Sequence, residues 1–317
     1  MANIRDIAKR SGYSASTVSR FINHSGYVSD TAREEIKQVI DELDYVPNAI
    51  ARDLSTGKTH TIGVVVPDTG HPFFTQLLYG IMDTAFAEGY NVLVLKSQYD
   101  EKIELKYLEK LHRKAYDALI FTSHKLPLKQ LESYQKYGPV VCCENPGATK
   151  IAASYVMREN AYVKAFDWIN HQGFSRIAIL LSRSEEISST SKTIFRAYQH
   201  VFKKVPLDNY VFTNLFNYQD GYRIATAVVQ KHPDFIFGNS DDIVAGVRQY
   251  YLDHNLPLPA LMGQENQISG KILNLMTIDH HLKRVGKSAC ELAIRGNIQK
   301  IAVESDFIMR NATAKFD

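Results

Sequence analysis

From Thr61 onward, the sequence alternates between short apolar runs and longer segments with helical spacing. The first four runs are TIGVVVP (61–67), NVLVL (91–95), DALIF (117–121) and PVVCC (139–143). Strands that are apolar along their whole length, and that are separated by helices, are typical of parallel sheets covered on both faces. The alternation therefore predicts an α/β fold built on doubly wound parallel sheets.

A second series of the same kind follows the first. Its strands are RIAILL (176–181), a short strand near 210–212, DFIFG (234–238) and ALMG (260–263). The helices that we predict between the strands of both series cover 73–88, 101–113, 126–136, 160–171, 190–203, 221–231 and 241–254. Two series predict two lobes, with a ligand cleft between them near the carboxyl ends of the strands. A helix over 282–295 and a last strand over 302–309 are expected to cross back and complete both lobes.

Residues 3–23, NIRDIAKRSGYSASTVSRFIN, have a different pattern, which is typical of two short helices joined by a turn. Asn3 and Ser14 are helix-capping residues, and Gly12 interrupts the helical spacing between them. Such a pair matches a helix-turn-helix, although it also occurs in other small helical bundles. Helices this short need a partner, and a third amphipathic helix capped by Ser29 supplies one.

The second of these helices presents small and polar side chains at its N-terminal end, together with Arg20. A recognition helix needs such a surface to enter the major groove of DNA. Residues 1–33 carry five Lys/Arg against two Asp/Glu, whereas residues 34–59 carry three against six. Positive charge is therefore concentrated where the first two helices would meet phosphate, and we expect a dimer to double these contacts.

The segment 46–59 connects this helical region to the α/β region. Pro47 disfavours helix at Val46, and residues 48–54 are long enough for only one or two helical turns. One interpretation is a plain interdomain linker. The alternative, favoured by a leucine in an otherwise polar segment, is a hinge helix that orders on DNA and inserts Leu54 into the minor groove.

The sequence contains none of the common catalytic or metal-binding signatures. No GxGxxG or GxxxxGK[ST] follows the first strand, where residues 67–72 read PDTGHP, and neither GxSxG nor HExxH occurs. The 11 histidines are scattered, and Cys142, Cys143 and Cys290 have no metal-ligand or CxxC spacing. We therefore expect a protein that is not an enzyme and that binds no metal or cofactor.

Length and composition indicate a globular protein of two or three domains. The chain has 317 residues, of which 45% are hydrophobic and 22% are charged, with a net charge of +3. No apolar run approaches the roughly 20 residues of a membrane helix, and the N-terminus lacks the apolar core of a signal peptide. We expect a cytoplasmic location, where the cysteines are packed, reduced thiols.

Several colinear segments of this chain resemble the LacI/GalR family of transcription regulators, and the resemblance covers its whole length. They are NIRDIAKRSGYSASTVSRFIN, YVPNAIARDLSTGKTHTIGVVVPD, HPFF and SDDIVAG. The resemblance implies a homodimer that reads a pseudo-palindromic operator in double-stranded DNA, with hinge helices in the central minor groove. It also implies a core that is similar to periplasmic sugar-binding proteins.

The resemblance also implies the domain organisation. Residues 1–45 would form the helix-turn-helix domain, 46–59 the hinge, and 60–317 the effector-binding and dimerisation core. Within the core, one lobe would cover about 60–157 and 283–304, and the other about 158–282 and 305–317.

The resemblance assigns roles to residues of the DNA-binding region. The expected DNA-binding residues are Ser14, Ala15, Ser16, Thr17, Arg20, Asn23, Asn48, Ala51 and Leu54. Ala15, Ser16 and Arg20 stand at base-reading positions, where the arginine fits a bidentate contact to guanine. The other helix residues are expected to contact phosphate and fix the register. In the hinge, Leu54 matches the minor-groove wedge and Ala51 the small residue that lets paired hinge helices approach.

The family's effector site is matched less completely. The expected effector-binding residues are His71, Phe73, Phe74, Arg183, Lys192, Phe216, Asp241 and Glu265. Phe216 stands where an aromatic ring stacks on a sugar or base, Asp241 at a polar ligand contact, and Glu265 at the ligand carboxylate. Two of these have a structural alternative, because Phe216 would also suit a core and Asp241 a helix cap.

One departure from the family lies in this site. The family often has an arginine where this chain has Ile194. Either Lys192 or Arg183 replaces that charge, or the effector is held differently. Residues 182–184, Ser-Arg-Ser, would suit a phosphate oxygen, which favours a sugar phosphate slightly over chance.

Together these features predict a repressor of carbohydrate-utilisation genes whose operator affinity is changed by a small sugar or sugar phosphate. Whether the ligand releases or promotes DNA binding depends on its affinity for the two states, and release is the commoner expectation from the resemblance. One alternative is a sugar-binding transport component, which the lack of a signal peptide and the presence of residues 1–57 disfavour. The other is a sugar-metabolising enzyme, which the lack of a catalytic constellation disfavours.

Overall fold

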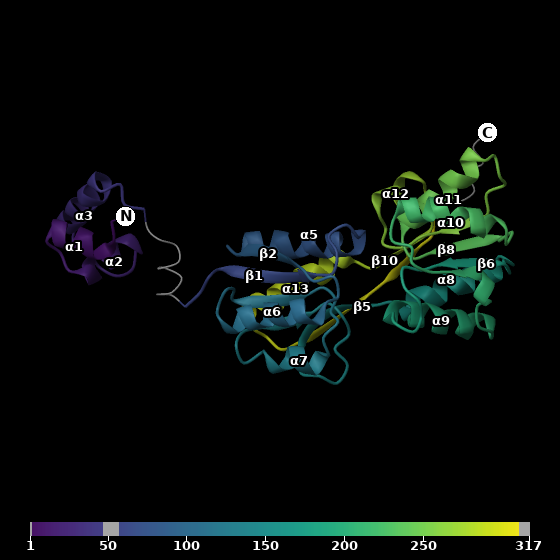
Figure 1. Cartoon of the computed structure of the whole chain (residues 1–317), viewed down its shortest axis with the longest axis horizontal. Helices are drawn as coiled ribbons and strands as arrows, with labels where there is room; N and C mark the ends of the chain where they lie inside the picture. Colours follow the sequence, from purple (N-terminus) through teal and green to yellow (C-terminus); the bar gives the residue numbers. More distant parts are fainter. Residues whose placement is uncertain (1, 47–56, 311–317) are drawn as a thin grey trace. The chain divides into compact units, whose positions relative to one another are not determined.

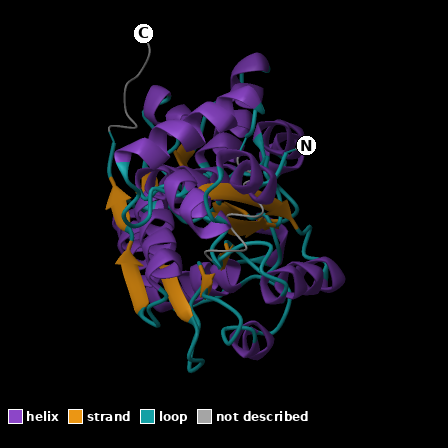
Figure 2. Ribbon diagram, turned by 90° about the vertical axis from the view of Figure 1, so that its left-hand side faces the viewer, coloured by secondary structure: helices purple, strands orange, loops and turns teal. Residues whose placement is uncertain are grey.

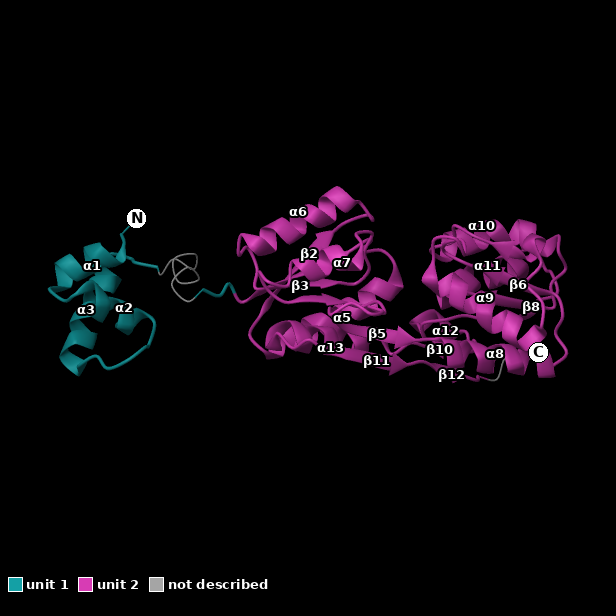
Figure 3. Ribbon diagram, turned by 90° about the horizontal axis from the view of Figure 1, so that it is seen from below, with its two compact units in different colours: residues 1–59 teal, residues 60–317 magenta. Residues whose placement is uncertain are grey.

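The computed structural model describes residues 2–46 and 57–310 and divides the chain into two compact units. Unit 1 covers residues 1–59 and unit 2 covers residues 60–317 (Figures 1 and 3). Each unit packs around its own buried apolar residues.

Unit 1 is a bundle of helices. Its helices are α1 (Ile4–Ser11), α2 (Ala15–Ile22) and α3 (Asp30–Glu42). The predicted caps are present: the Asn3 side chain accepts a hydrogen bond from the Arg5 backbone N–H at 2.8 Å, and the Ser14 hydroxyl accepts one from Thr17 at 3.1 Å. Buried apolar residues of all these helices form one core, so each short helix is held by the others.

The first lobe of unit 2 contains a six-stranded parallel sheet with the strand order β11-β5-β4-β3-β1-β2. Its strands are β1 (Thr61–Val66), β2 (Asn91–Lys96), β3 (Ala118–Phe121), β4 (Val140–Cys142), β5 (Ala152–Met157) and β11 (Lys300–Glu304). The central strands are buried on both faces, as their continuous apolar runs predict.

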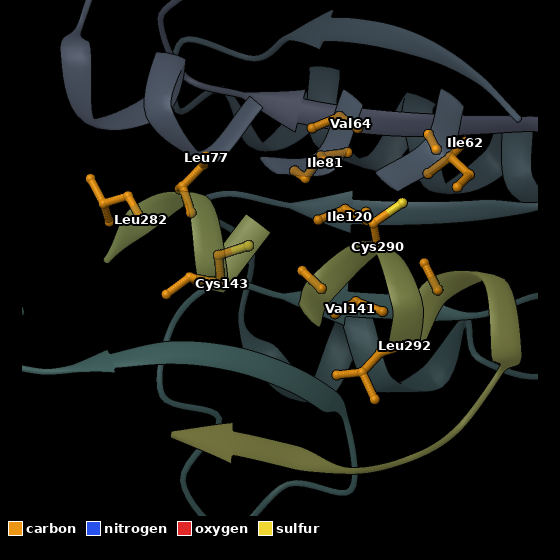
Figure 4. Packing of buried hydrophobic residues seen from close by; sticks show 14 of the residues in the cluster. Ile62, Val64, Leu77, Ile81, Ile120, Val141, Cys143, Leu282, Cys290 and Leu292 are labelled. Carbon is orange, nitrogen blue, oxygen red and sulfur yellow. The ribbon is translucent and has the colours of Figure 1, made fainter. Parts of the chain in front are cut away.

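Helices cover both faces of this sheet. They are α5 (Pro72–Ala87) and α13 (Leu282–Arg295) on one face, and α6 (Glu101–His112) and α7 (Leu128–Ser133) on the other. Val64 packs with the first pair (Figure 4), whereas its neighbour Val65 packs with the second. Where α5 meets α13, a Cβ at Gly80 would lie 2.0 Å from the Lys283 carbonyl oxygen, so this close approach requires glycine.

The second lobe has a four-stranded parallel sheet with the order β7-β6-β8-β9. Its strands are β6 (Ile177–Leu180), β7 (Val211–Phe212), β8 (Phe235–Gly238) and β9 (Ala260–Met262). Helices α8 (Glu159–His171) and α9 (Ser189–Phe202) pack on one face, and α10 (Tyr218–Val229) and α11 (Asp241–Asp253) on the other. The short helices η1 (Asp208–Tyr210) and α12 (Ile268–Ile272) complete the lobe. Figure 2 shows strands lying between helices, which is the doubly wound arrangement that the sequence predicts.

Within the described residues, three connections join the two lobes. β5 leads into α8, β10 (Thr277–Asp279) leads into α13, and β11 leads into β12 (Asp306–Ile308). The single last strand predicted over 302–309 is therefore two strands. β11 pairs with β5 in the first lobe, and β12 pairs antiparallel with β10 in the second. Ser305 lies between β11 and β12, and its backbone N–H donates a hydrogen bond to the Met157 carbonyl oxygen at 3.0 Å.

Two elements differ from prediction for identifiable reasons. β5 was not predicted, because Ala152, Ala153 and Ser154 are small residues without the β-branched and aromatic character typical of strands. Its place in the sheet comes from its neighbours β4 and β11. α7 is shorter than the predicted helix over 126–136, because Pro127 occupies its N-cap position.

Candidate functional site

A cavity of about 830 Å³ lies between the two lobes of unit 2. Its walls include loops that follow strands β1, β3 and β4 in the first lobe and β6, β8 and β9 in the second. These loops meet because parallel strands place their carboxyl ends at one edge of the sheet. The cavity therefore lies where the strand pattern predicts a cleft, and its size suits a small organic ligand.

His71 lines this cavity and caps the N-terminus of α5. Its Nδ1 accepts a hydrogen bond from the Phe73 backbone N–H at 3.2 Å. Burial lowers the pKa of the imidazole to about 4, so the ring is neutral at pH 7. Since Nδ1 is an acceptor, we assign the proton to Nε2, which leaves that atom as a hydrogen-bond donor.

The expected aromatic residues Phe73, Phe74 and Phe216 also line the cavity. Phe73 and Phe74 form an edge-to-face pair with ring centroids 5.2 Å apart, and Phe74 is part of the first-lobe core. Phe216 is 43% exposed, and its backbone N–H donates to the Asp220 carboxylate at 2.9 Å. Phe216 therefore has a ring face available for stacking, whereas Phe74 contributes packing.

The second-lobe wall includes the buried side chains of Gln264, Glu265 and His280. The Gln264 side-chain oxygen accepts a hydrogen bond from the Tyr162 hydroxyl at 2.9 Å and lies 3.2 Å from His280 Nε2. Glu265 Oε2 accepts one from the Gln267 side-chain amide at 2.8 Å. Burial raises the pKa of Glu265 well above its usual value and lowers the pKa of His280 well below its own, so it favours the neutral form of both groups. This wall therefore offers neutral donors and acceptors in fixed positions, which suits hydroxyl groups.

Asp241, for which a direct ligand contact was expected, is not among the residues that line the cavity. It is the first residue of α11, and its side chain is fully buried within the second lobe. Its carboxylate accepts hydrogen bonds from the Gln267 backbone N–H and from the Thr277 hydroxyl, both at 2.7 Å. Burial raises the pKa of this carboxyl to about 7. Asp241 therefore fixes the loop that carries Glu265.

Arg183 and Lys192 line the cavity, whereas Ile194 is fully buried in the second-lobe core. The Arg183 guanidinium lies 4.9 Å from the ring centroid of Tyr99, a residue of the first lobe. Another contact between the lobes joins the Gln76 side-chain amide to the Glu265 carbonyl oxygen at 3.0 Å. Rotation of one lobe against the other would have to change both contacts.

Arg158 also lines the cavity, and the sequence analysis did not single it out. It directly precedes α8, at the connection from the first lobe to the second, and its guanidinium lies 5.7 Å from the Phe73 ring centroid. The positive charge of Arg158 lowers the pKa values of Glu265 and His280. Burial has the larger effect on the pKa of each group. The sequence feature that could have identified Arg158 is a basic residue at the predicted boundary between the two lobes.

In unit 1, α2 presents the expected base-reading residues at the surface. Ala15, Ser16 and Arg20 are exposed, whereas Val18 is buried. Ser14 Oγ lies 2.7 Å from Ser16 Oγ, so the cap also orients a predicted base-reading hydroxyl. Thr17 lies near the N-terminal end of α2, and Asn23 is the C-cap residue of this helix. The remaining expected DNA-binding residues, Asn48, Ala51 and Leu54, lie outside the described residues.

Residues 2–46 and 57–310 also bear on other classes of function. In these residues, no group of three or more His, Cys, Asp or Glu side chains is arranged to hold a metal ion. Nor does this part of the chain contain a helix long and apolar enough to cross a membrane.

A small helical unit with an exposed recognition helix, followed by a two-lobed α/β core with an interlobe cavity, defines a class of ligand-responsive DNA-binding regulators. Two known families match the sequence. "Bacterial regulatory proteins, lacI family" matches residues 3–48, and "Periplasmic binding proteins and sugar binding domain of LacI family" matches residues 59–269. The chain belongs to the LacI family of bacterial regulatory proteins.

Individual relatives agree with this assignment. Catabolite control protein B of Bacillus subtilis is 33% identical over 309 residues, covering 97% of this chain and 99% of that protein. The ribose operon repressor of Escherichia coli is 26% identical, covering 93% and 92%. Among solved structures, the lac repressor dimer bound to operator and an anti-inducer has a TM-score of 0.81 at 17% identity, covering 98% and 99%. The chain is therefore a DNA-binding transcriptional regulator and not an enzyme.

Proposed function

We propose that this regulator is a repressor of carbohydrate-utilisation genes, and that a small sugar or sugar phosphate in the interlobe cavity changes its affinity for operator DNA. The observation that carries the proposal is the second-lobe wall, where the side chains of Gln264, Glu265 and His280 are buried and hydrogen-bonded in place. Such groups recognise hydroxyls, and the exposed Phe216 ring beside them suits the apolar face of a sugar. LacI-family regulators from Enterococcus faecium and Lactobacillus casei have been solved with bound ribose and glucose, respectively.

The proposed effector contacts come from both lobes. His71, Phe73 and Phe74 contribute from the first lobe, and Arg183, Lys192, Phe216 and Glu265 from the second. Asp241 acts through the loop that it holds. A ligand that touches both lobes favours one relative position of the lobes, and this is the differential affinity that a switch requires.

The proposed DNA contacts divide into two kinds. Ala15, Ser16 and Arg20 would read bases in the major groove, with Arg20 bidentate to guanine. Ser14, Thr17 and Asn23 would contact phosphate and set the register. Asn48, Ala51 and Leu54 would act in a hinge in the minor groove. The operator would be a pseudo-palindrome in double-stranded DNA, bound by a homodimer in the cytoplasm.

A stripe of exposed apolar residues on the first lobe supports the homodimer. Tyr79, Met82 and Phe86 lie on one side of α5 and are 53%, 49% and 86% exposed. Val94 is also exposed, on the edge strand β2, and it shares the face of the sheet that α5 covers because Val92 packs there. Contiguous exposed apolar surface of this kind marks an interaction site.

Operator selection tests the DNA-binding part of the proposal. The purified protein is bound to random duplexes, the bound fraction is sequenced, and the selection is repeated with Arg20→Ala. We expect a symmetric site in which the variant loses one guanine preference per half-site, worth about 1–3 kcal/mol of discrimination. Enrichment of an unsymmetric site, or an unchanged guanine preference in the variant, would contradict it.

A further inference from the structure

The basic residues that line the cavity differ in how their charges are balanced. Lys96 pairs with Asp68 at 3.7 Å, and Arg196 pairs with Glu159 at 3.8 Å. Lys192 is partly balanced by Glu186: the Ser184 hydroxyl chiefly, and Lys192 to a smaller extent, hold the pKa of that carboxyl below its usual value. Lys96 and Arg196 are therefore already paired, and Lys192 is partly balanced.

Arg158 and Arg183 are held in another way. Among the described residues, neither guanidinium has a carboxylate oxygen within 4.0 Å. Instead, Arg158 faces the Phe73 ring and Arg183 faces the Tyr99 ring, at 5.7 and 4.9 Å from the ring centroids. An aromatic face attracts a cation but does not neutralise it. Both guanidinium groups therefore line the cavity with uncompensated charge and with N–H donors available.

The acidic residues nearby do not cancel these charges. Glu265, whose ionised form Arg158 favours, is fully buried, and burial raises the pKa of its carboxyl well above the usual value. Glu144 accepts a hydrogen bond from the Ser123 hydroxyl and lies 3.8 Å from the His124 ring. His71 stands near Arg183 and is neutral. Asp68, whose charge acts on His71 more strongly than that of Arg183, pairs with Lys96 at 3.7 Å. In the part of the chain that the structure describes, none of these carboxylates forms an ion pair with Arg158 or Arg183.

We propose that Arg158 and Arg183 form an anion subsite of the cavity, and that the effector is a sugar that carries a phosphate or a carboxylate. This inference rests on the proposed function and narrows the class of ligand. Guanidinium groups bind both anions through paired N–H donors, and each charged hydrogen bond is stronger than a neutral one. The hydroxyls of the same ligand would meet Glu265, and the His71 Nε2–H is a further donor beside the anion.

The position of Arg158 gives the subsite a direct connection to the lobes. It lies between β5 of the first lobe and α8 of the second, while Arg183 follows β6 of the second lobe and reaches Tyr99 of the first. An anion that draws Arg183 away from Tyr99 would replace one interlobe contact by another. Binding would therefore change the balance between lobe positions in addition to selecting the ligand.

Calorimetric titration of the full-length protein tests the inference with matched pairs of sugars. The pairs are glucose with glucose 6-phosphate, glucose with glucuronate, and ribose with ribose 5-phosphate. We expect the charged member of at least one pair to bind about tenfold or more tightly, and this ratio to fall with salt. Comparing the phosphate pairs with the glucuronate pair separates the two kinds of anion.

The variants Arg158→Gln and Arg183→Gln should each reduce that ratio by about tenfold while affecting the neutral sugar by less than about threefold. Arg176→Gln is the matched control, because Arg176 precedes β6 at the end remote from the cavity and pairs with Asp234 at 3.8 Å. Arg158→Lys keeps the charge and should retain most of the preference, which separates lost charge from lost folding.

The possible failures are distinguishable. If a neutral sugar binds as tightly as its charged partner and the glutamine variants leave the ratio unchanged, the anion subsite is wrong and the proposed function survives. If the charged sugars bind but Arg176→Gln weakens them as much as Arg183→Gln, the assignment to these two residues is wrong. If none of these sugars binds, neutral or charged, both this inference and the proposed sugar effector are contradicted.

Discussion

The two sides of the interlobe cavity differ in how their polar groups are satisfied. On the second-lobe wall, Gln264, Glu265 and His280 bond to other buried groups and are fixed before any ligand arrives. Around the connection between the lobes, the guanidinium groups of Arg158 and Arg183 lie against aromatic rings and have no ion pair among the residues that the structure describes. Cation–π contacts at partly exposed sites are worth about 0.5–2 kcal/mol, so these side chains can turn toward a ligand at small cost.

The difference suggests a division of roles. A fixed, neutral wall recognises uncharged groups without rearrangement, because its donors and acceptors are already oriented. Charged groups that are loosely held can follow a ligand and change contacts between the lobes. Recognition of hydroxyls and response to the ligand would then depend on different residues of one cavity.

The largest predicted effect concerns the support of the fixed wall. Asp241→Ala leaves the Gln267 backbone N–H and the Thr277 hydroxyl without their buried acceptor. We expect the free energy of unfolding of unit 2 to fall by about 3 kcal/mol at pH 7, because each unsatisfied buried donor costs about 1–3 kcal/mol. Urea denaturation followed by the fluorescence of Trp168, the single tryptophan, measures the change.

Asp241→Asn is the matched control, since it keeps one side-chain oxygen in nearly the same volume. It should cost clearly less than the alanine variant. Equal losses for the two variants, or a loss below about 1 kcal/mol for alanine, would mean that this wall is not a fixed network.

An effect of similar size, spread over a range of pH, is expected at the first-lobe side from the titration of His71. Its folded pKa of about 4 lies below the value of 6.5 for an unperturbed histidine, so the unfolded state takes up a proton first as the pH falls. The contribution of the neutral His71 ring to the free energy of unfolding is fully present above pH 6.5, and it is lost as the pH falls from about 6.5 to 4. The full loss is about 3 kcal/mol at most, from 1.36 kcal/mol per pKa unit.

His71→Asn removes the titrating group but keeps an acceptor for the Phe73 backbone N–H, because asparagine is a good N-cap. The difference in unfolding free energy between the two proteins should therefore change in favour of the variant as the pH is lowered from 7 to 4. The difference between the two proteins is needed because Asp241 has the opposite pH dependence. Its raised pKa stabilises the folded state as the pH falls over this range. A difference that is constant with pH would show that His71 is not buried as a neutral ring.

Much of this fold could be predicted from the sequence, for a physical reason. Strands such as β1 and β8 are buried on both faces and must be apolar throughout, so their composition reveals them. β5 has small residues, and its neighbours in the sheet place it, which composition does not encode. Capping residues such as Ser14 act locally, within four residues, and were correctly predicted.

The site was less accessible to sequence analysis. Phe216 and Glu265 were found through the family resemblance, and both line the cavity. The sequence could not place the Asp241 side chain, because the first residue of a helix can face either a ligand or the lobe interior, and packing decides between them. Arg158 was missed because two features of the fold bring it to the cavity. The chain crosses from one lobe to the other at this residue, and its guanidinium lies over the ring of Phe73, which is 85 positions earlier in the sequence.

The most direct test of the account is the affinity for the selected operator, measured by fluorescence anisotropy with and without a saturating sugar ligand found by calorimetry. The account predicts a change of at least about fivefold with the wild type, because typical coupling energies are about 1–3 kcal/mol. It also predicts that Arg183→Gln, tested at ligand concentrations that still saturate it, shows a smaller change. A ligand that fills the cavity and leaves operator affinity unchanged would contradict the claim that the cavity controls DNA binding.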